Sequence, residues 1–582
     1  MKKLILSLGF IASIYLLKAQ NPTFQWVKTT GTINEKTAGN AITKDANGNT
    51  YTTGVFSGTV DFDPGTGIYN LSCPSAPGSG IFILKLDPNG NFIWAKGIGN
   101  TESFNTSTAI QLDNNGNILV VGAFEGTMDF DPGTGIVNKT SSGGTDAFVL
   151  KLDGNGNFMW IKSFGNNNND NCSDFRLDAT GYMYLTGGFN GTVNFDTGAG
   201  TSTLTSTPAA SAGSSGTDIF ISKLDPAGNL VWVKSMGGGD LDETTSIELD
   251  GSGNIYTTGT FYGTTDLDPG AGTANFTAPG WSNIFVSKLD ASGNFVWAKS
   301  IGQTFENTGR GIAVNLIGEV YVTGYFNGTA DFDPDAGTFN MSSAGLSDIF
   351  IMKLKNNGSL GWAKRIGDSG NDMSVSLATD MTNNVYVCGY YSVGADFDPG
   401  TGVFMLNSAG DEDTFILKLD ANGNFLWANS IGGPGDDTFN ASDLTIDASN
   451  NVYTTGKFRE TVDFDPSPAV FNVTATGGTN LNSSDMFIHK LGYNQTSTGI
   501  KSIDGKNDIA KLYPNPNNGT FTIDLTEDVT MNIIDVLGNT LLNESKAEGH
   551  HSISLPNLAN GVYFINLSNQ KQQQTFKIIK SN

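Results

Sequence analysis

The side chains best suited to chemistry in this 582-residue chain are aspartates spaced two residues apart, in segments that recur along the sequence. Two residues at i and i+2 lie on the same side of a strand. A pair of carboxylates there could bind a hard cation such as calcium, together with main-chain carbonyls. The candidate calcium ligands are Asp61, Asp63, Asp129, Asp131, Asp266, Asp268, Asp331, Asp333, Asp396, Asp398, Asp463 and Asp465.

The same aspartates also have a purely structural interpretation. Aspartate followed by Pro-Gly could simply end a strand and form the tip of a small hairpin, here Thr59–Phe62 against Ile68–Leu71. Near-identical copies favour this interpretation, because a repeat copies its structural residues together. The third copy, Asn194–Thr197, lacks one carboxylate and the proline, so a cation site would be weakest there. No cofactor other than this possible calcium is predicted.

Groups for acid–base or nucleophilic catalysis are scarce. His489 is the only histidine between residues 20 and 493, and it lies within an apolar strand pattern. No nucleophile motif accompanies it, and no Gly-rich phosphate loop opens a helix. Two carboxylates would suffice for glycoside hydrolysis. A carbohydrate-active enzyme is therefore the alternative to a non-enzymatic protein, and it would show one cluster of carboxylates and aromatics that breaks the repeat pattern.

Charge and cysteine content exclude several other classes. The net charge is −25 and the isoelectric point is about 4.3, which argues against a nucleic-acid partner. Cys73, Cys172 and Cys388 are widely separated, so a disulfide scaffold or a structural zinc site is not expected. These cysteines are predicted to be buried or loop thiols.

The elements that position the aspartates form a repeat that occurs seven times between Phe24 and Leu491. Copies of the Asp-Phe-Asp-Pro segment start at residues 61, 129, 194, 266, 331, 396 and 463, which gives spacings of 65 to 72 residues. Each repeat has only strand signals. A period of this length built from strands predicts an all-β fold, a seven-bladed β-propeller over residues 20–493.

One repeat shows the predicted strand order. Strands are expected at 108–113, 117–124, 146–153 and 158–162. The Trp residue in the fourth strand of each repeat is predicted to pack between neighbouring blades. Strands one and two, and strands three and four, are joined by tight Asp-initiated turns in which Gly-Asn supplies the positive φ angles. These turns begin at Asp45, Asp87, Asp113, Asp153, Asp178, Asp225, Asp250, Asp290, Asp420 and Asp447.

The tight turns must share one face of the disc, so the long, variable connections must share the opposite face. Variable loops gathered on a rigid scaffold are the usual arrangement for recognition. The ends of the repeat region also complement each other. Phe24–Lys28 is a Trp strand with no preceding partner, and Met486–Leu491 is a partner with no following Trp strand. We therefore expect Phe24–Lys28 to pair beside Asp485–Leu491 and to close the ring.

These repeats resemble a known family. Asp146–Asn157, the Trp strand with its following Gly, and Gly253–Gly259 are similar to the SBBP-type β-propeller repeat. The resemblance covers about four fifths of the chain, although Asp-Phe-Asp-Pro stands where that family more often has Ser-x-x-Phe-Pro. It implies a bacterial surface protein and implies no single activity.

A second resemblance covers the C-terminal segment. Residues 494–510 are a polar linker, and after it strands are predicted at 521–525, 530–536, 552–555, 562–567 and 575–579, which suit a small β-sandwich. Leu512–Pro516, Gly519–Phe521, Val536–Gly538, Gly561–Tyr563 and Lys577–Lys580 resemble the type A sorting domain of the type IX secretion system. The resemblance implies export by that machinery, removal of residues 511–582 on release or attachment, and a source among the Bacteroidota.

The N-terminus adds a signal for export. Lys2 and Lys3, the apolar run Leu4–Leu17 and Lys18-Ala19 are typical of a secretory signal peptide over residues 1–19, and no later stretch could span a membrane. The sequence thus predicts a secreted or cell-surface protein. Its expected function is non-enzymatic binding or adhesion to a glycan or surface protein, and a passive structural role is the other alternative.

Overall fold

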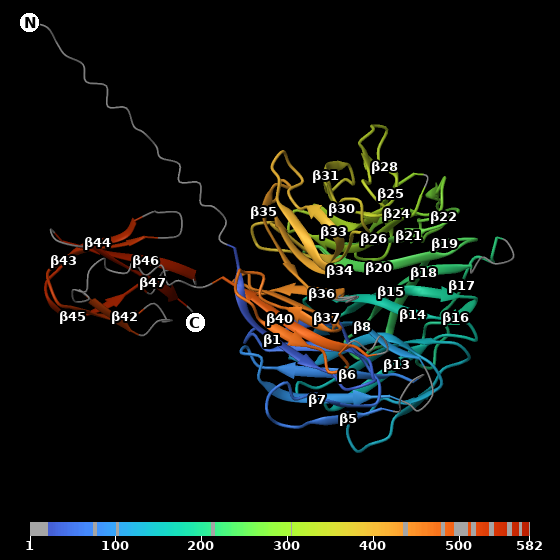
Figure 1. Cartoon of the computed structure of the whole chain (residues 1–582), viewed down its shortest axis with the longest axis horizontal. Coiled ribbons are helices and arrows are strands. Elements are labelled where there is room, and N and C mark those ends of the chain that lie inside the picture. Colours follow the sequence, from blue (N-terminus) through green and yellow to red (C-terminus); the bar gives the residue numbers. More distant parts are fainter. Residues whose placement is uncertain are drawn as a thin grey trace, which may run out of the picture. The chain divides into compact units, whose positions relative to one another are not determined.

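The structure is a computed structural model of the whole chain, and it describes residues 21–73, 78–99, 104–210, 216–303, 305–434, 440–478, 483–493, 510–513, 520–534, 540–555, 561–569 and 573–580. The chain divides into two compact units between Tyr493 and Asn494. The predicted signal peptide and most of the predicted linker lie outside the described residues. The prediction of an all-β chain is confirmed, because every element among the described residues is a strand (Figure 1).

The first unit contains seven antiparallel sheets, and each has a core of four strands. Four of them are formed, in spatial order, by β2(Thr37–Lys44)–β3(Thr50–Phe56)–β6(Gly80–Leu86)–β7(Phe92–Ile98), β8(Asn105–Leu112)–β9(Ile118–Phe124)–β12(Asp146–Leu152)–β13(Phe158–Phe164), β14(Asn171–Leu177)–β15(Met183–Asn190)–β18(Thr217–Leu224)–β19(Leu230–Gly238), and β20(Asp242–Leu249)–β21(Ile255–Phe261)–β24(Asn283–Leu289)–β25(Phe295–Ile301). The other three are β26(Asn307–Val314)–β27(Val320–Phe326)–β30(Asp348–Leu354)–β31(Leu360–Ile366), β32(Met373–Thr379)–β33(Val385–Asp396)–β34(Met405–Leu419)–β35(Phe425–Ile431), and β36(Asn440–Ile446)–β37(Val452–Phe458)–β40(Asp485–Gly492)–β1(Thr23–Thr30).

The second and third strands of each sheet are the most deeply buried, because their apolar residues point to both faces. In β9 and β12 every residue is buried. β-branched and aromatic residues such as those of β6 favour such a strand, since they pack well on a pleated surface. The fourth strand, for example β7, is only partly buried and lies at the outer edge.

A small hairpin is inserted between the second and third strands of each repeat, at the place of the Asp-Phe-Asp-Pro segment. The predicted hairpin of the first repeat is present, with Asp61 opposite Asn70. In the sixth repeat the hairpin is continuous with β33 and β34. The separate hairpins are β4(Thr59–Asp61)–β5(Asn70–Ser72), β10(Thr127–Asp129)–β11(Asn138–Thr140), β16(Thr192–Asn194)–β17(Thr203–Thr205), β22(Thr264–Asp266)–β23(Asn275–Thr277), β28(Thr329–Asp331)–β29(Asn340–Ser342) and β38(Thr461–Asp463)–β39(Asn472–Thr474).

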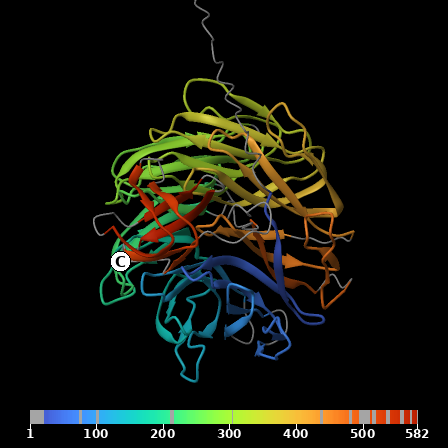
Figure 2. The same cartoon turned by 90° about the vertical axis from the view of Figure 1, so that its left-hand side faces the viewer.

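The first strands of the seven sheets pack beside one another in a circular order. β2 lies beside β8, and the order continues through β14, β20, β26 and β32 to β36, which lies beside β2 again. Seven apolar clusters fill the spaces between neighbouring sheets; one of them joins Ile42 and Phe82 of the first sheet to Tyr453 and Ile488 of the last. Figure 2 shows these sheets arranged around a common centre.

The N-terminal strand belongs to the last sheet. β1 pairs antiparallel with β40, with Thr23 opposite Gly492 and Thr30 opposite Met486. Strand β40 also pairs with β37, so β1 takes the place of the outer fourth strand. The sheet that ends the repeat region is thus assembled from both ends of it.

The tight turns have the predicted aspartate at their first position. In the first one, Oδ1 of Asp45 accepts hydrogen bonds from the amides of Asn47 and Asn49, each at 2.9 Å. The prediction that both residues of Gly-Asn adopt positive φ was wrong. Gly48 alone does so, with φ of 83°, whereas the Asn49 side chain donates to Oδ2 of Asp45 at 2.6 Å. The asparagine therefore stabilises the turn through its amide.

The Trp residues pack between neighbouring sheets, as predicted. The ring of Trp232 in β19 lies against Gly293, the turn glycine of the next sheet, where a Cβ would come 3.1 Å from the ring. Equivalent contacts join Trp94 to Gly156 and Trp362 to Gly423. Trp427 has no such turn to face, because the chain leaves the last sheet there, and its Nε1 donates instead to the Tyr493 hydroxyl at 3.1 Å.

The second unit contains two antiparallel sheets that share one apolar core, which includes Phe521, Met531 and Ile565. The strand β41 begins at Ala510, inside the predicted linker. The prediction missed β41 and β44, which lack a clear alternation of apolar and polar residues. The strands are β41(Ala510–Tyr513), β42(Thr520–Leu525) and β45(Gly549–Ser554) in one sheet, and β44(Thr540–Lys546), β43(Val529–Ile534), β46(Gly561–Ser568) and β47(Gln573–Lys580) in the other.

Candidate functional site

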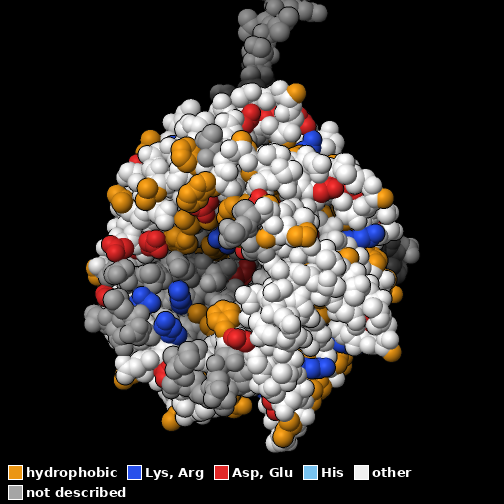
Figure 3. Space-filling view, turned by 90° about the vertical axis from the view of Figure 1, so that its right-hand side faces the viewer, with side chains coloured by type: hydrophobic (Ala, Val, Ile, Leu, Met, Phe, Trp, Pro, Cys, Tyr) orange, Lys and Arg blue, Asp and Glu red, His pale blue; other side chains and the backbone are white. Residues whose placement is uncertain are grey.

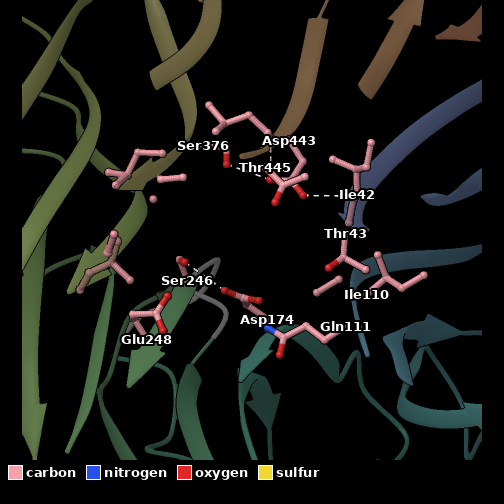
Figure 4. A pocket seen from close by; sticks show the side chains of 18 of the residues that line it. Ile42, Thr43, Ile110, Gln111, Asp174, Ser246, Glu248, Ser376, Asp443 and Thr445 are labelled. Carbon is pink, nitrogen blue, oxygen red and sulfur yellow. Dashed lines mark hydrogen bonds between the residues drawn. The ribbon is translucent and has the colours of Figure 1, made fainter. Parts of the chain in front are cut away.

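The first strands of the seven sheets surround a polar channel of about 540 Å³. Every one of these strands contributes lining residues, and Figure 4 shows side chains from several of them pointing into the common space. Asp174, Glu248 and Asp443 supply carboxylates, and Arg176 supplies a guanidinium. The channel is thus a place where residues that are distant in sequence meet.

Asp174 of β14 links two neighbouring sheets. Its Oδ1 accepts from the Phe175 amide at 2.8 Å and from Arg176 Nη1 at 2.7 Å. Its Oδ2 accepts from the Ser246 hydroxyl at 3.0 Å and from the Ile247 amide at 3.1 Å. Both oxygens are therefore engaged, and the carboxylate bridges β14 to β20.

Arg176 lies between two carboxylates. Its Nε donates to Glu248 Oε2 at 3.0 Å, in addition to the bond with Asp174. Desolvation alone would lower the pKa of Arg176, but the charges of Asp174 and Glu248 outweigh it and raise this pKa. The guanidinium is thus fixed by the protein and is held in the charged state.

Asp443 of β36 makes a comparable bridge. The Ile42 amide of β2 donates to its Oδ2 at 2.9 Å, while the Ser376 hydroxyl of β32 and the Leu444 amide donate to its Oδ1, each at 2.8 Å. Desolvation inside the channel nevertheless raises the pKa of Asp443 to about 6. This carboxyl group therefore connects three consecutive sheets and can exchange a proton under mildly acidic conditions.

These channel residues were not predicted from the sequence, although the repeat contains a signal for them. Asp174 and Asp443 stand four residues before the aspartate of the first tight turn of their repeats. At that position the other repeats have small residues, namely Ala41, Ala109, Ser246, Gly311 and Ser376. A departure from the repeat pattern on the innermost strand was thus visible in the sequence.

A wider cavity of about 960 Å³ adjoins the channel and shares six lining residues with it, among them Thr108, Arg310 and Ser442. It lies at the N-terminal ends of the first strands, where the long connections enter. Figure 3 shows a hollow near the middle of the molecule when it is viewed from the side of β16 and β17. We call this wider cavity the funnel.

The funnel combines aromatic, amide and charged side chains. Phe104 is 60% exposed in it, and Tyr390 lies on its wall. The guanidinium of Arg310 lies over the ring of Tyr325, 5.6 Å from its centroid. The other polar lining residues include Glu125, Asn169, Asn171 and Glu243. Because each repeat contributes different residue types, the funnel wall is not seven-fold symmetric.

The twelve candidate calcium ligands are not brought to the funnel or the channel. They remain in their separate hairpins, where the first aspartate of each pair caps the turn. In the first repeat, Oδ1 of Asp61 accepts from the amides of Asp63 and Tyr69, and Oδ1 of Asp63 accepts from Gly65. The same bonds recur in every other repeat, with Asn194 replacing the first aspartate in the third. This geometry agrees with the structural interpretation, and calcium binding there stays a prediction.

The histidine and the three cysteines of the first unit are buried and do not line the funnel. His489 is fully buried in β40, and its Nε2 lies 3.1 Å from the Phe464 carbonyl oxygen. Cys73, Cys172 and Cys388 are buried cysteines. Among the described residues no three His, Cys, Asp or Glu side chains gather as a metal cluster. Within the same part of the chain, no helix has the length and apolar character needed to cross a membrane.

The second unit matches a known family. Residues 511–581 match the secretion system C-terminal sorting domain. The sorting domain of the type IX secretion system is thus present at the predicted place, and it indicates export to the cell surface or secretion.

The chain is also similar to two curated proteins at low identity. A region of 434 residues is 25% identical to an uncharacterised WD repeat-containing protein of Acanthamoeba polyphaga mimivirus, over 63% of this chain and 31% of that protein. A region of 177 residues is 24% identical to the regulatory protein FlaEY of Caulobacter vibrioides, over 30% of this chain and 18% of that protein. The chain thus spans about a third or less of either relative. Among solved structures, PorZ is a surface component of the type IX secretion system of Porphyromonas gingivalis. Its alignment covers 94% of this chain and 81% of the PorZ chain, at 10% identity and a TM-score of 0.24.

Proposed function

We propose that this chain is an exported, non-enzymatic binding or adhesion module that recognises a glycan or a surface protein at the funnel. In this proposal the seven sheets are the blades of a seven-bladed β-propeller of SBBP type, closed by β1. The sorting domain delivers it through the type IX machinery after removal of the N-terminal signal peptide, residues 1–19.

The funnel is the observation that carries the proposal. A cavity of about 960 Å³ is in the size range of small-ligand sites. Aromatic side chains such as Phe104 and Tyr390 offer flat apolar surfaces, while Asn169, Asn171 and Glu243 offer hydrogen-bonding groups around them. Apolar surface bordered by such polar groups suits a sugar, which has apolar ring faces and hydroxyl edges. The seven-fold repeat alone would not produce this asymmetric wall.

A glycan array probed with labelled residues 21–493 would test the proposal, with immobilised extracellular-matrix proteins printed on the same slide. We expect binding to at least one glycan or protein class. Tyr390→Ala should reduce this binding at least ten-fold, because stacking on an aromatic ring is lost. Met381→Ala is the matched control, since Met381 is 89% exposed in the tight turn after β32 and lies outside the funnel lining. Absence of binding to every probe, or equal binding by both variants, would contradict the proposal and favour a passive structural role.

The carbohydrate-active enzyme is the second candidate, because Asp174, Glu248 and Asp443 break the repeat pattern inside the channel. The raised pKa of Asp443, about 6, would suit a general acid. Against this, the hydrogen bonds that fix Asp174 and Asp443 are made within the protein. Reducing-sugar release from the glycans that bind on the array, compared between the wild type and Asp443→Asn, separates the two functions. Hydrolysis that is lost in the variant would favour the enzyme.

A further inference from the structure

The junction between the third and fourth sheets of the first unit contains three buried oxygen atoms that make no hydrogen bond of ordinary geometry. They are Oδ1 of Asp218 in β18, Oδ1 of Asp242 in β20 and Oγ1 of Thr265 in β22. The side chains are 4%, 0% and 0% exposed, respectively. Burying polar groups without partners is costly, and for charged groups the cost is higher still. Such a group of oxygens therefore requires an explanation.

These side chains are fixed in position by their other bonds. Oδ2 of Asp218 accepts from the amide and hydroxyl of Thr207, at 2.9 and 3.2 Å. Oδ2 of Asp242 accepts from the Gly238 amide at 2.6 Å. Each carboxylate thus presents its second oxygen to the junction in a defined direction.

A local change in the sheets brings Thr265 to the same place. β19 is longer than the other outer strands, and its last residues pair with β22, so that Gly238 lies opposite Thr265. The Gly237–Asp266 pairing recurs as the single bridges Gly99–Asp129 and Gly432–Asp463, but among the described strands only the third sheet extends it by a second residue pair. The Thr265 hydroxyl lies beside the Asp242 carboxyl group. At Gly237 a Cβ would come 2.3 Å from Oδ1 of Asp218, so a glycine is needed to leave this space open.

The carboxyl groups of Asp218 and Asp242 lie close enough to influence each other. Burial raises the pKa of Asp242 to about 8, and the charges of Asp218 and Asp240 add to the effect. Burial also raises the pKa of Asp218 to about 6. The main influences on these two groups come from burial, hydrogen bonds and other carboxylates, and they include no Lys or Arg.

The other junctions that hold two carboxylates stabilise them within the protein. Between the fifth and sixth sheets the pair is Asp348 and Asp372, and Arg365 forms an ion pair with Asp348. Ser235 stands in place of this arginine in the third sheet, since Phe220 faces Ser235 as Phe350 faces Arg365.

Two other junctions avoid an unpartnered carboxylate pair in other ways. Between the fourth and fifth sheets the two carboxylates are replaced by the neutral amides of Asn283 and Asn307. Between the second and third, both oxygens of Asp146 and of Asp170 accept backbone amides, from Ser142, Asn166 and Asn190. The Asp218–Asp242 junction is thus the one of these four that has free carboxylate oxygens and no arginine.

We infer that a hard divalent cation, of the calcium or magnesium class, binds between Asp218 and Asp242, with the Thr265 hydroxyl as a third oxygen ligand. Such ions prefer carboxylate, hydroxyl and carbonyl oxygens, and water completes their coordination. The ion supplies the positive charge that Arg365 supplies in the fifth sheet. It also joins two sheets, so its role is to stabilise the ring, and it is independent of ligand binding at the funnel.

The test uses residues 21–582 freed of metal with a chelator, at pH 8.0, where protons compete least. Addition of CaCl₂ or MgCl₂ should raise the unfolding midpoint by about 3–5 °C at a hundred-fold excess over the dissociation constant. Titration calorimetry should show one site lost in the double variant Asp218→Asn with Asp242→Asn, which copies the Asn283–Asn307 junction.

Ser235→Arg provides the second variant, because it copies Arg365. It should unfold at a higher temperature than the metal-free wild type and should no longer respond to either cation. Asp131→Asn is the control for the Asp-Phe-Asp-Pro hairpins and should keep the full response. Three results would each overturn the inference: no response of the wild type to either cation, a response that survives in the double variant, or a response lost in Asp131→Asn.

Discussion

Protonation of the buried His489 should destabilise the first unit. Burial lowers its pKa to about 4, against about 6.5 for an exposed histidine. Its ring stacks against Phe24 of β1, with the centroids 5.7 Å apart. The unfolded chain therefore takes up a proton below pH 6.5 before the folded chain does. Stability contributed by neutral His489 is present above pH 6.5 and is lost as the pH falls towards 4.

His489→Leu should remove this acid sensitivity, since Leu84, Leu150 and Leu417 occupy the same place in other repeats. We expect the variant to gain stability relative to the wild type as the pH falls from 7 to 4.5, by up to about 3 kcal/mol. Calorimetric unfolding of both proteins at several pH values measures this difference. Parallel curves across that range would show that His489 does not titrate as described.

Substitution of two turn glycines would measure the cost of a strained backbone conformation separately from the cost of disturbed packing. Gly116 and Gly293 have φ of 77° and 78°, but a Cβ at Gly116 would meet nothing within 4 Å, whereas one at Gly293 would come 3.1 Å from the ring of Trp232. Gly116→Ala should cost about 1 kcal/mol from the positive φ alone. Gly293→Ala should cost at least about 1 kcal/mol more, because the ring must shift. Equal midpoints in denaturant unfolding would refute the packing contact.

The aspartates show what could be predicted at this scale. The turn aspartates such as Asp45 were predictable, because their role depends only on the next four residues. Asp174 and Asp443 were not, because their role depends on strands from different repeats that meet only in the folded ring. Their departure from the repeat pattern indicated a special role but not its partners.

At the scale of elements, the repeat predicted the strands well where both faces are buried. β12 was predicted from its continuous apolar run, because a strand covered on both sides needs apolar residues at every position. β44 was missed, since most of its residues are exposed and its sequence need not alternate. The continuation of β19 towards β22 was also not predictable, because Gly237 and Gly238 carry no strand signal.

Removal of β1 tests the role of the N-terminal strand. A chain that begins at Thr32 lacks the pairing of β1 with β40 and the contacts of Val27 in the core of the last sheet. We expect the unfolding midpoint of the whole first unit to fall, with a loss of several kcal/mol, because all seven sheets pack in one ring. Circular dichroism during heating measures this. An unchanged cooperative transition would mean that β1 is a dispensable appendage.

At the scale of the molecule, the two compact units should unfold independently. Each has its own apolar core, and the cores share no residue. Deletion of residues 494–582 should therefore leave the unfolding midpoint of the first unit within about 1 °C of its value in the longer chain. Differential scanning calorimetry on both forms measures this, and one merged transition that shifts on deletion would contradict it.

The pairing of β1 with β40 also has a consequence for synthesis. Strand β1 leaves the ribosome first, and its partner follows more than 450 residues later. Until then the early strand has an unsatisfied edge, and such edges promote aggregation. A message cut short before β40 would yield a chain in which β1 lacks this partner. The edge of β1 is therefore covered only once the whole repeat region has been made.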